Sequence, residues 1–417
     1  MAILEAHPAI DPQKLDKLAE VAVHVGLNLQ EGQDLVLTAP LEAMPLVRRV
    51  AAVAYRAGAG LVTPLVHDEQ VVLARFAHGN DASFDRAANW LFNGMAEAYD
   101  NNAARMNISG ENPGLLAGQD PEKISRIGKA NSIAGRPAME RITGFNINWS
   151  IVAYPTVAWA RKVFPDVDEA AAVGQLAEAI FAASRVNEVY PVAAWAEHDA
   201  RLHARKDWMN QHNFQALHFK GPGTDLTVGL AEGHSWNGGS SMAKNGVACN
   251  PNIPTEEVFT TPHAQRVDGT VRASKPLVHQ GTLIDGIEAR FEAGRIVEVT
   301  CDSGQDVFRK LIDTDEGAAR LGEVALVPFC SPISDTGVLF FNTLFDENAA
   351  CHIAQGQCYS ECFVEGVSGD KDKMAAAGGN ESLIHVDWMI GGPGTEIDGI
   401  KADGTRVPVF RDGGWAA

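Results

Sequence analysis

The sequence lacks several features that would place it in a familiar class. No apolar run approaches the ~20 residues of a membrane-spanning helix, and the N-terminal stretch has neither the basic region nor the apolar core of an export signal. No GxGxxG or GxxxxGKS/T motif follows an expected strand, so the nucleotide-binding fingerprints are missing. The GxSxG motif of serine hydrolases is also missing. We therefore expect a cytoplasmic protein outside these membrane, nucleotide-binding and serine-hydrolase classes.

Positive charge is scarce as well. The chain has 34 Lys and Arg against 53 Asp and Glu, which gives a formal net charge of −19. Nucleic acids and anionic membranes attract basic surfaces, so neither is expected as a partner. An acidic surface suits small cationic or zwitterionic ligands, and it also serves solubility alone. With 417 residues, 46% hydrophobic and 21% charged, the chain has the composition of a globular protein that is too long for one core.

Cysteine is missing from the first half of the chain, and all six cysteines follow residue 248. Without an export signal, free thiols are expected rather than a disulfide framework. Cys351, His352, Cys358 and Cys362 lie close together, but they lack the paired CxxC spacing of a structural zinc site. Buried small side chains are the favoured interpretation of this cluster.

The order of periodic segments predicts an α/β fold with two domains. Residues 1–212 alternate short apolar runs with longer amphipathic segments, which indicates an N-terminal α/β domain with a mostly parallel sheet. The expected strands of this domain are 34–38, 61–68, 104–113 and 145–156. From 213 to 417, short strands separated by Gly- and Asp-containing turns predict a β-rich α+β domain. Inserted helices are expected there at 303–320 and at about 345–355.

Candidate metal ligands occur in four segments of the second domain. In the segment LIHVDWMIGG, His385 and Asp387 lie on one face of an expected strand. They could bind a metal or simply form a His–Asp hydrogen bond. Glu323 opens an apolar run, Glu257 lies in a proline-bounded segment, and His352 follows a short helical pattern. Taken singly, these three fit a solvated strand end, a charged loop and a core histidine.

Together, these residues have the composition of a two-metal hydrolase site. Carboxylates and imidazoles in this mixture suit two divalent ions such as Zn, Co or Mn, which activate water for hydrolysis. The predicted ligands are Glu257, Glu323, His352, His385 and Asp387. Glu256 is the candidate for taking a proton from the water. Tyr359 is the candidate for donating a hydrogen bond to the oxyanion.

Longer segments around these residues carry a family resemblance. NIPTEEVFTTPH, SPISDTGVLFFNTLFDENAACHIAQG and IHVDWMIG resemble signature segments of the aminopeptidase T / aminopeptidase S family of metalloaminopeptidases. The resemblance is strongest from about residue 225 to 392. It implies that the same five residues are the metal ligands and that Tyr359 lies near the site. It also implies a homodimer of two-domain chains, with an internal cavity, that removes N-terminal residues from short peptides.

Two departures and one alternative accompany the resemblance. Gln355 stands where the family is expected to have an apolar residue, and Asp335 stands where a basic one is usual. The alternative is a mononuclear non-haem iron ring-cleaving dioxygenase on the same scaffold, whose metal set is reduced to about two histidines and a carboxylate. Because all five ligands of a dinuclear site are present, the peptidase is the favoured prediction.

Overall fold

The computed structural model describes residues 5–279 and 282–416. The chain forms two compact units: unit 1 is Met1–Glu197 with Ser240–Pro254, and unit 2 is His198–Gly239 with Thr255–Ala417. This division differs from a single boundary at residue 212. The division falls inside helix α8 (Pro191–His212). The later segment Ser240–Pro254 belongs to unit 1, because its backbone pairs there. Ile151 N–H donates to Pro251 O at 2.7 Å, and Ile253 N–H donates to Ile151 O at 3.0 Å.

Unit 1 is built on a parallel four-stranded sheet in the order β2-β1-β3-β4. Its strands are β1 (Leu35–Pro40), β2 (Val62–His67), β3 (Ala104–Ser109) and β4 (Trp149–Ala153). A two-stranded pair is formed by β7 (Ser241–Met242) and β8 (Ala248–Cys249). The parallel sheet confirms the α/β fold expected for the first part of the chain, since apolar runs buried between helices form parallel strands.

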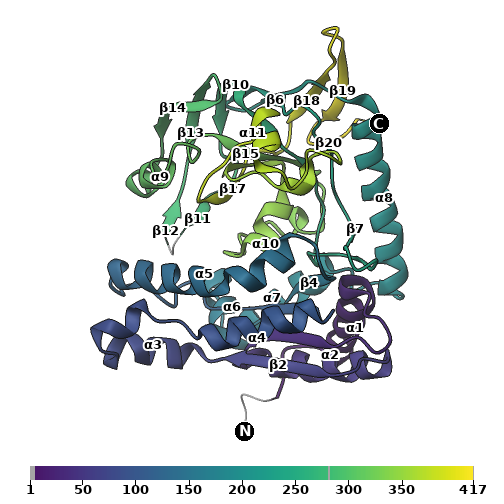
Figure 1. Ribbon diagram of the computed structural model, residues 1–417, viewed down its shortest axis with the longest axis vertical. Helices are drawn as coiled ribbons and strands as arrows, with labels where there is room; N and C mark the ends of the chain where they lie inside the picture. Colours follow the sequence, from purple (N-terminus) through teal and green to yellow (C-terminus); the bar gives the residue numbers. More distant parts are fainter. Residues whose placement is uncertain (1–4, 280–281, 417) are drawn as a thin grey trace. The chain divides into compact units, whose positions relative to one another are not determined.

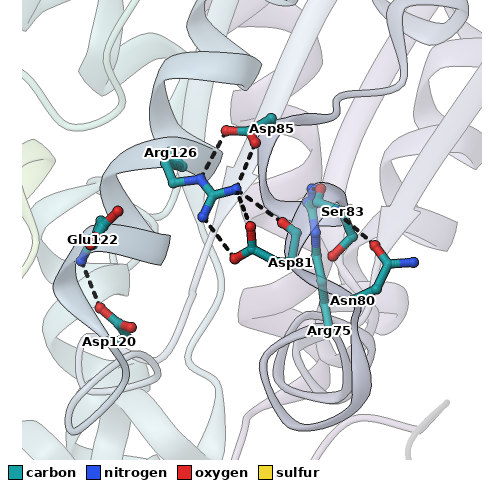
Figure 2. Close-up of polar contacts among 8 residues, drawn as sticks. All are labelled: Arg75, Asn80, Asp81, Ser83, Asp85, Asp120, Glu122 and Arg126. Atoms are coloured by element: carbon teal, nitrogen blue, oxygen red, sulfur yellow. Dashed lines mark hydrogen bonds and ion pairs between the residues drawn. The ribbon is translucent and has the colours of Figure 1, made fainter.

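Helices surround this sheet, as Figure 1 shows for unit 1. They are α1 (Pro12–Val21), α2 (Met44–Arg56), α3 (Glu69–His78), α4 (Asn89–Asp100), α5 (Pro121–Thr143), α6 (Val157–Val163) and α7 (Glu169–Ala183). Tyr99 of α4 and Ile142 of α5 pack with Val36 of β1. Arg126 ties α5 to the short helix Asp81–Asp85 through both carboxylates of that helix, at 2.9 Å and 2.6 Å (Figure 2).

Unit 2 contains an antiparallel eight-stranded sheet in the order β14-β13-β10-β6-β5-β18-β19-β20. Its strands are β5 (Ala216–Gly221), β6 (Thr224–Leu230), β10 (Pro262–Arg272), β13 (Glu288–Glu292), β14 (Arg295–Thr300), β18 (Glu396–Ile400), β19 (Arg406–Arg411) and β20 (Gly414–Trp415). β11 (Leu277–His279) and β12 (Thr282–Ile284) form a separate pair. The β-rich second part of the chain is thereby confirmed.

A second, four-stranded antiparallel sheet of unit 2 has the order β17-β16-β15-β9. Its strands are β9 (Val258–Thr260), β15 (Leu321–Leu326), β16 (His352–Gly356) and β17 (His385–Met389). One hydrophobic core joins the two sheets, because Phe219 and Phe291 of the large sheet cluster with Ile353 and Trp388 of the small one. Every residue of β15 and β16 is buried. The small sheet is therefore a rigid support for side chains on its other face.

The helices of unit 2 differ in part from the expectation. They are α9 (Gln305–Ile312), α10 (Thr343–Asp346) and α11 (Lys371–Ala376). The prediction of a helix at about 345–355 is wrong for the second half of that range. Helical structure ends with the 3₁₀ turn Glu347–Ala349, and Ala350 is fully extended at φ −163° and ψ 164°. His352 then opens strand β16, where pairing with both neighbouring strands outweighs the local helical pattern.

Two further expectations can be compared with the structure. All six cysteines are free, as predicted, and only Cys330 is exposed. Among the described residues, none of the helices combines the length and the apolar character needed to cross a membrane.

Candidate metal centre

Three neighbouring strands of the small sheet bring four of the five predicted ligands onto one face. Glu323 on β15 lies opposite Ala354 on β16, which in turn lies opposite Asp387 on β17. His352 and His385 share that face, because side chains two residues apart point the same way. The register of β15 shifts between Leu321 and Glu323, and such bulges often re-aim a side chain beside a functional site. The small Ala354 side chain leaves space between the two carboxylates.

The side chains converge as two groups that share Glu323. The first group is Glu257, Glu323 and His352, and the second is Glu323, His385 and Asp387, with the donor atoms of each group within 4.8 Å of one another. Glu257 joins from the residue before β9. One oxygen of Glu323 lies 3.9 Å from His352 Nε2, and the other lies 3.1 Å from His385 Nε2. The structure thus brings all five predicted ligands together.

These spacings fit metal coordination. Ligand atoms ~2.1 Å from one tetrahedral ion lie about 3.4 Å apart. His352 Nε2 is 3.3 Å from Glu257 Oε2, and His385 Nε2 is 3.5 Å from Asp387 Oδ1. No described residue offers His385 Nε2 a hydrogen bond of ordinary geometry, although the atom is buried. A cation between these atoms would give that nitrogen a partner.

The second ring nitrogen of each histidine is held by a backbone carbonyl. His352 Nδ1 lies 3.2 Å from Ala350 O, and His385 Nδ1 lies 2.7 Å from Gln357 O. Nδ1 is the natural donor in both contacts, since a carbonyl oxygen can only accept. Nε2 of each ring then faces the carboxylates, and it would offer its lone pair to a cation that displaces its proton. Metal-binding histidines are commonly oriented in this way.

The electrostatics also indicate a cation site. Burial, together with the charges of Asp387 and Glu257, raises the pKa of Glu323 against the opposing effect of His385. Burial lowers the pKa of His352, but its contact with Glu257 and the surrounding carboxylates raise it to about 10. So many acidic groups in a buried space require compensating positive charge. Divalent ions would supply that charge.

Tyr359 lies beside the metal-ligand groups. Its ring centroid is 4.5 Å from that of His385, and its side chain is 39% exposed. Partial burial and then the negative charges of Glu323 and Asp387 raise the pKa of the hydroxyl well above its ordinary value. Tyr359 therefore stays protonated at neutral pH and can donate a hydrogen bond, as its predicted role requires.

Glu256 has different surroundings from its neighbour Glu257. Its backbone N–H donates to Asn348 Oδ1 at 2.8 Å, and its carboxylate lies 3.6 Å from His198 Nε2. His198 is a buried residue of α8 whose Nε2 also lies 2.8 Å from Thr255 O. Adjacent side chains in an extended segment point in opposite directions. The structure accordingly pairs the Glu256 carboxylate with His198, and Glu257 with His352.

Two further carboxyl groups lie near the centre and are not among the site residues predicted from the sequence. Burial and the charges of Glu257 and Asp387 raise the pKa of Glu347 well above its ordinary value. Burial and the charges of Glu323 and Glu257 raise the pKa of Glu361 to about 7. Glu347 lies five residues before His352 and Glu361 two residues after Tyr359. The one sequence feature that could have indicated these two glutamates is their proximity to the predicted site residues.

The fold and the site define a class of protein. The β-rich unit carries a cluster of carboxylates and imidazoles, and this set of side chains is typical of the metal centres of metal-dependent hydrolases.

Comparisons with known proteins identify the family. Residues 11–415 match the model of the thermophilic metalloprotease (M29) family, and the chain belongs to it. The chain is 53% identical to "Aminopeptidase T" of Thermus thermophilus over 403 residues, which are 97% of this chain and 98% of that protein. It is 41% identical to "Aminopeptidase AmpS" of Bacillus subtilis over 404 residues, again 97% and 98% of the two chains.

A solved structure supports the same assignment. "Wild-type AmpT from Thermus thermophilus" superposes with a TM-score of 0.92 at 52% identity, covering 97% of this chain and 99% of that one. The protein is therefore a metalloaminopeptidase, a hydrolase of peptide bonds, and the predicted family, fold and activity are confirmed. The relatives described above are aminopeptidases, which argues against the ring-cleaving dioxygenase.

Proposed function

We propose that this aminopeptidase releases N-terminal residues from short peptides at a centre for two divalent ions that share Glu323. The supporting observation is that the two oxygens of Glu323 face different imidazoles, His352 at 3.9 Å and His385 at 3.1 Å. Glu257 completes one group and Asp387 the other. A carboxylate that faces two ligand groups is suited to bridge two ions.

The residues of the chain have distinct proposed tasks. When bound, the ions would supply a water of lowered pKa and a Lewis acid for the scissile carbonyl. Tyr359 donates a hydrogen bond to the developing oxyanion, which its raised pKa permits. Glu256 was predicted from the sequence to take the water's proton, and this stays a prediction. Glu347 is a second candidate for that task, because its carboxyl lies in the field of the ligands themselves.

The finer properties follow from the ligand types and the family resemblance. Carboxylate and imidazole ligands suit Zn, Co or Mn. The homodimer, the short-peptide preference and the cytoplasmic location stay predictions from the sequence.

Glu323→Gln tests the shared ligand. Outer-shell partners of metal ligands typically contribute 10–100-fold to metal affinity or activity, so replacing a bridging ligand should cost more than about 100-fold. We expect the variant to lose both bound ions by elemental analysis and to lose Leu-p-nitroanilide hydrolysis with Zn, Co or Mn.

Glu365→Gln is the matched control, since Glu365 is an exposed glutamate of the same unit. It should keep about two ions per chain and wild-type turnover. A Glu323→Gln enzyme that retained both metal and activity would remove Glu323 from the centre.

A further inference from the structure

A small cavity in unit 2 adjoins the metal centre. Its volume is about 40 Å³, and Asp387 and Glu347 line one side of it. The remaining wall includes five apolar side chains, which are Pro276, Leu277, Val278, Phe341 and Met389. At 10–15 Å³ per water, the cavity has room for about three water molecules. That is the space of a short aliphatic side chain and is too small for an aromatic ring.

The backbone at Phe341 is held in an unusual conformation. Its φ is +56°, in the left-handed region that bulky side chains rarely adopt. The buried carboxylate of Asp346 holds the residues on both sides: Oδ1 accepts from Phe340 N–H at 2.7 Å, and Oδ2 accepts from Asn342 N–H at 3.0 Å. Strained backbone that its surroundings maintain is often found at ligand sites. Here the residue with the strained backbone, Phe341, is part of the cavity wall.

The charges of the cavity restrict what it can bind. Asp346 also lines the cavity, but both of its oxygens already accept backbone N–H groups. Asp387 and Glu347 belong to the metal centre or its immediate surroundings. The acidic groups of the lining are thus engaged with the backbone or the metal centre. Of the seven other lining residues five are apolar, and the remaining two are Asn342 and Thr343. An aliphatic group gains free energy by leaving water for such a wall.

We propose that this cavity receives the side chain of the substrate's N-terminal residue and selects short aliphatic residues such as Val, Leu or Met. Phe341 is the specificity-determining residue, and Asp346 is its positioning residue. The inference rests on the proposed metal centre. The side chain of the substrate's N-terminal residue can enter the cavity only if the scissile bond lies beside Asp387.

Phe341→Gly is the decisive variant. Glycine accepts a φ of +56° without a steric cost, so the substitution removes the ring and leaves the turn unstrained. The readout is kcat/KM for the p-nitroanilides of Leu, Ala, Phe and Arg. The wild-type enzyme should favour Leu over the other three. In Phe341→Gly the Leu-to-Ala ratio should fall about tenfold, the lower end expected for lost apolar contact. The loss should be in KM, since the contact exists before and during the reaction.

Asp346→Asn tests the positioning role, because the amide keeps one acceptor oxygen and loses the other. It should lower the Leu-to-Ala ratio in the same direction but by less. Val297→Ala, which truncates a half-exposed apolar side chain on β14, should leave the ratio unchanged.

An unchanged Leu-to-Ala ratio in Phe341→Gly, or a wild-type preference for Arg or Phe, would overturn the inference. Metal content of each variant is measured in parallel. If the metal centre were wrongly assigned, Glu323→Gln would keep its ions and activity. That result is separate from the selectivity ratio, so the two failures are distinguishable.

Discussion

Gln355 is a polar side chain in a fully buried position. It lies on the face of β16 opposite His352, and its exposed fraction is 0%. Neither its Oε1 nor its Nε2 has a hydrogen-bond partner among the described residues. Leaving a buried polar group unpaired costs about 1–3 kcal/mol. We therefore expect Gln355→Met, which preserves the side-chain length, to raise the free energy of unfolding in urea by about 1–2 kcal/mol.

The neighbouring Gln357 is the matched control for this substitution. Its Nε2 donates to Cys358 O at 2.9 Å, and its Oε1 accepts from Ser382 N–H at 3.1 Å. Gln357→Met should therefore lower stability, because it leaves both partners unpaired. A Gln355→Met protein less stable than wild type would mean that the amide is satisfied in solution, by water for example.

At the residue scale, the site residues that could be predicted from the sequence are those that lie in recognisable segments. The five ligands could be predicted because their types fit one chemistry and because long segments around them resemble a family. Glu347 and Glu361 could not, since each is an isolated acid whose role depends on neighbours distant in sequence. The contact of His198 with Glu256 spans 58 residues, from a helix to an extended segment, and no local pattern indicates it.

Among the elements, the pairing of β16 with β17 depends on one glycine. Gly356 lies opposite His385 with φ +107°, and a Cβ at this position would come within 2.0 Å of Ile384 O. Gly356→Ala would therefore force the two strands apart beside a predicted ligand. We expect a loss of stability greater than the 1–3 kcal/mol typical of backbone strain alone, together with reduced metal content. Urea unfolding and elemental analysis measure the two effects.

Gly366→Ala is the control that distinguishes the cost of a positive φ from the steric clash expected at residue 356. Gly366 has a similar φ of +91°, but nothing lies within 4 Å of its Cβ position. It should show the backbone cost without loss of metal. Equal effects from the two substitutions would show that contact with β17 is unimportant.

Strand existence was predictable from the sequence, whereas register was not. Apolar runs identified β1 to β4 and β17, because buried strands are short and apolar. The helical pattern FDENAAC obscured the start of β16, and the shift in register before Glu323 leaves no signature in composition. Both features depend on pairing between segments that are distant along the chain.

At the scale of the whole molecule, the sequence predicts one boundary at residue 212, whereas the two units of the structure divide inside α8 and exchange a later segment. Turn-rich composition after residue 212 indicated the change from α/β to β-rich folding. It could not show that Ser240–Pro254 returns to unit 1, since that depends on backbone pairing with β4. All five predicted ligands nevertheless lie in unit 2.

This distribution predicts that metal removal affects the two units unequally. Ions that bind only the folded state stabilise it by RT ln(1 + [L]/Kd), which is about 2.7 kcal/mol when the free ion concentration is 100 times Kd. This stabilisation slows amide exchange from globally opened states about 100-fold. Without them, the buried Glu257 and Glu323 and the partly buried Asp387 lie close together with no cation between them. Chelation should therefore speed hydrogen exchange in β9, β15, β16 and β17 by up to about that factor, and change β1–β4 of unit 1 less.

Hydrogen-exchange mass spectrometry of the full chain, with chelator and then with Zn restored, measures this difference. Glu323→Gln serves as the control, because a protein that cannot hold the ions should not respond to chelation. Equal acceleration in both units would mean that they unfold as one cooperative body. No acceleration in either would mean that the buried carboxylates are neutralised by protons, as the raised pKa of Glu323 allows. The strands that lose protection therefore identify which carboxylates depend on the metal for their charge balance.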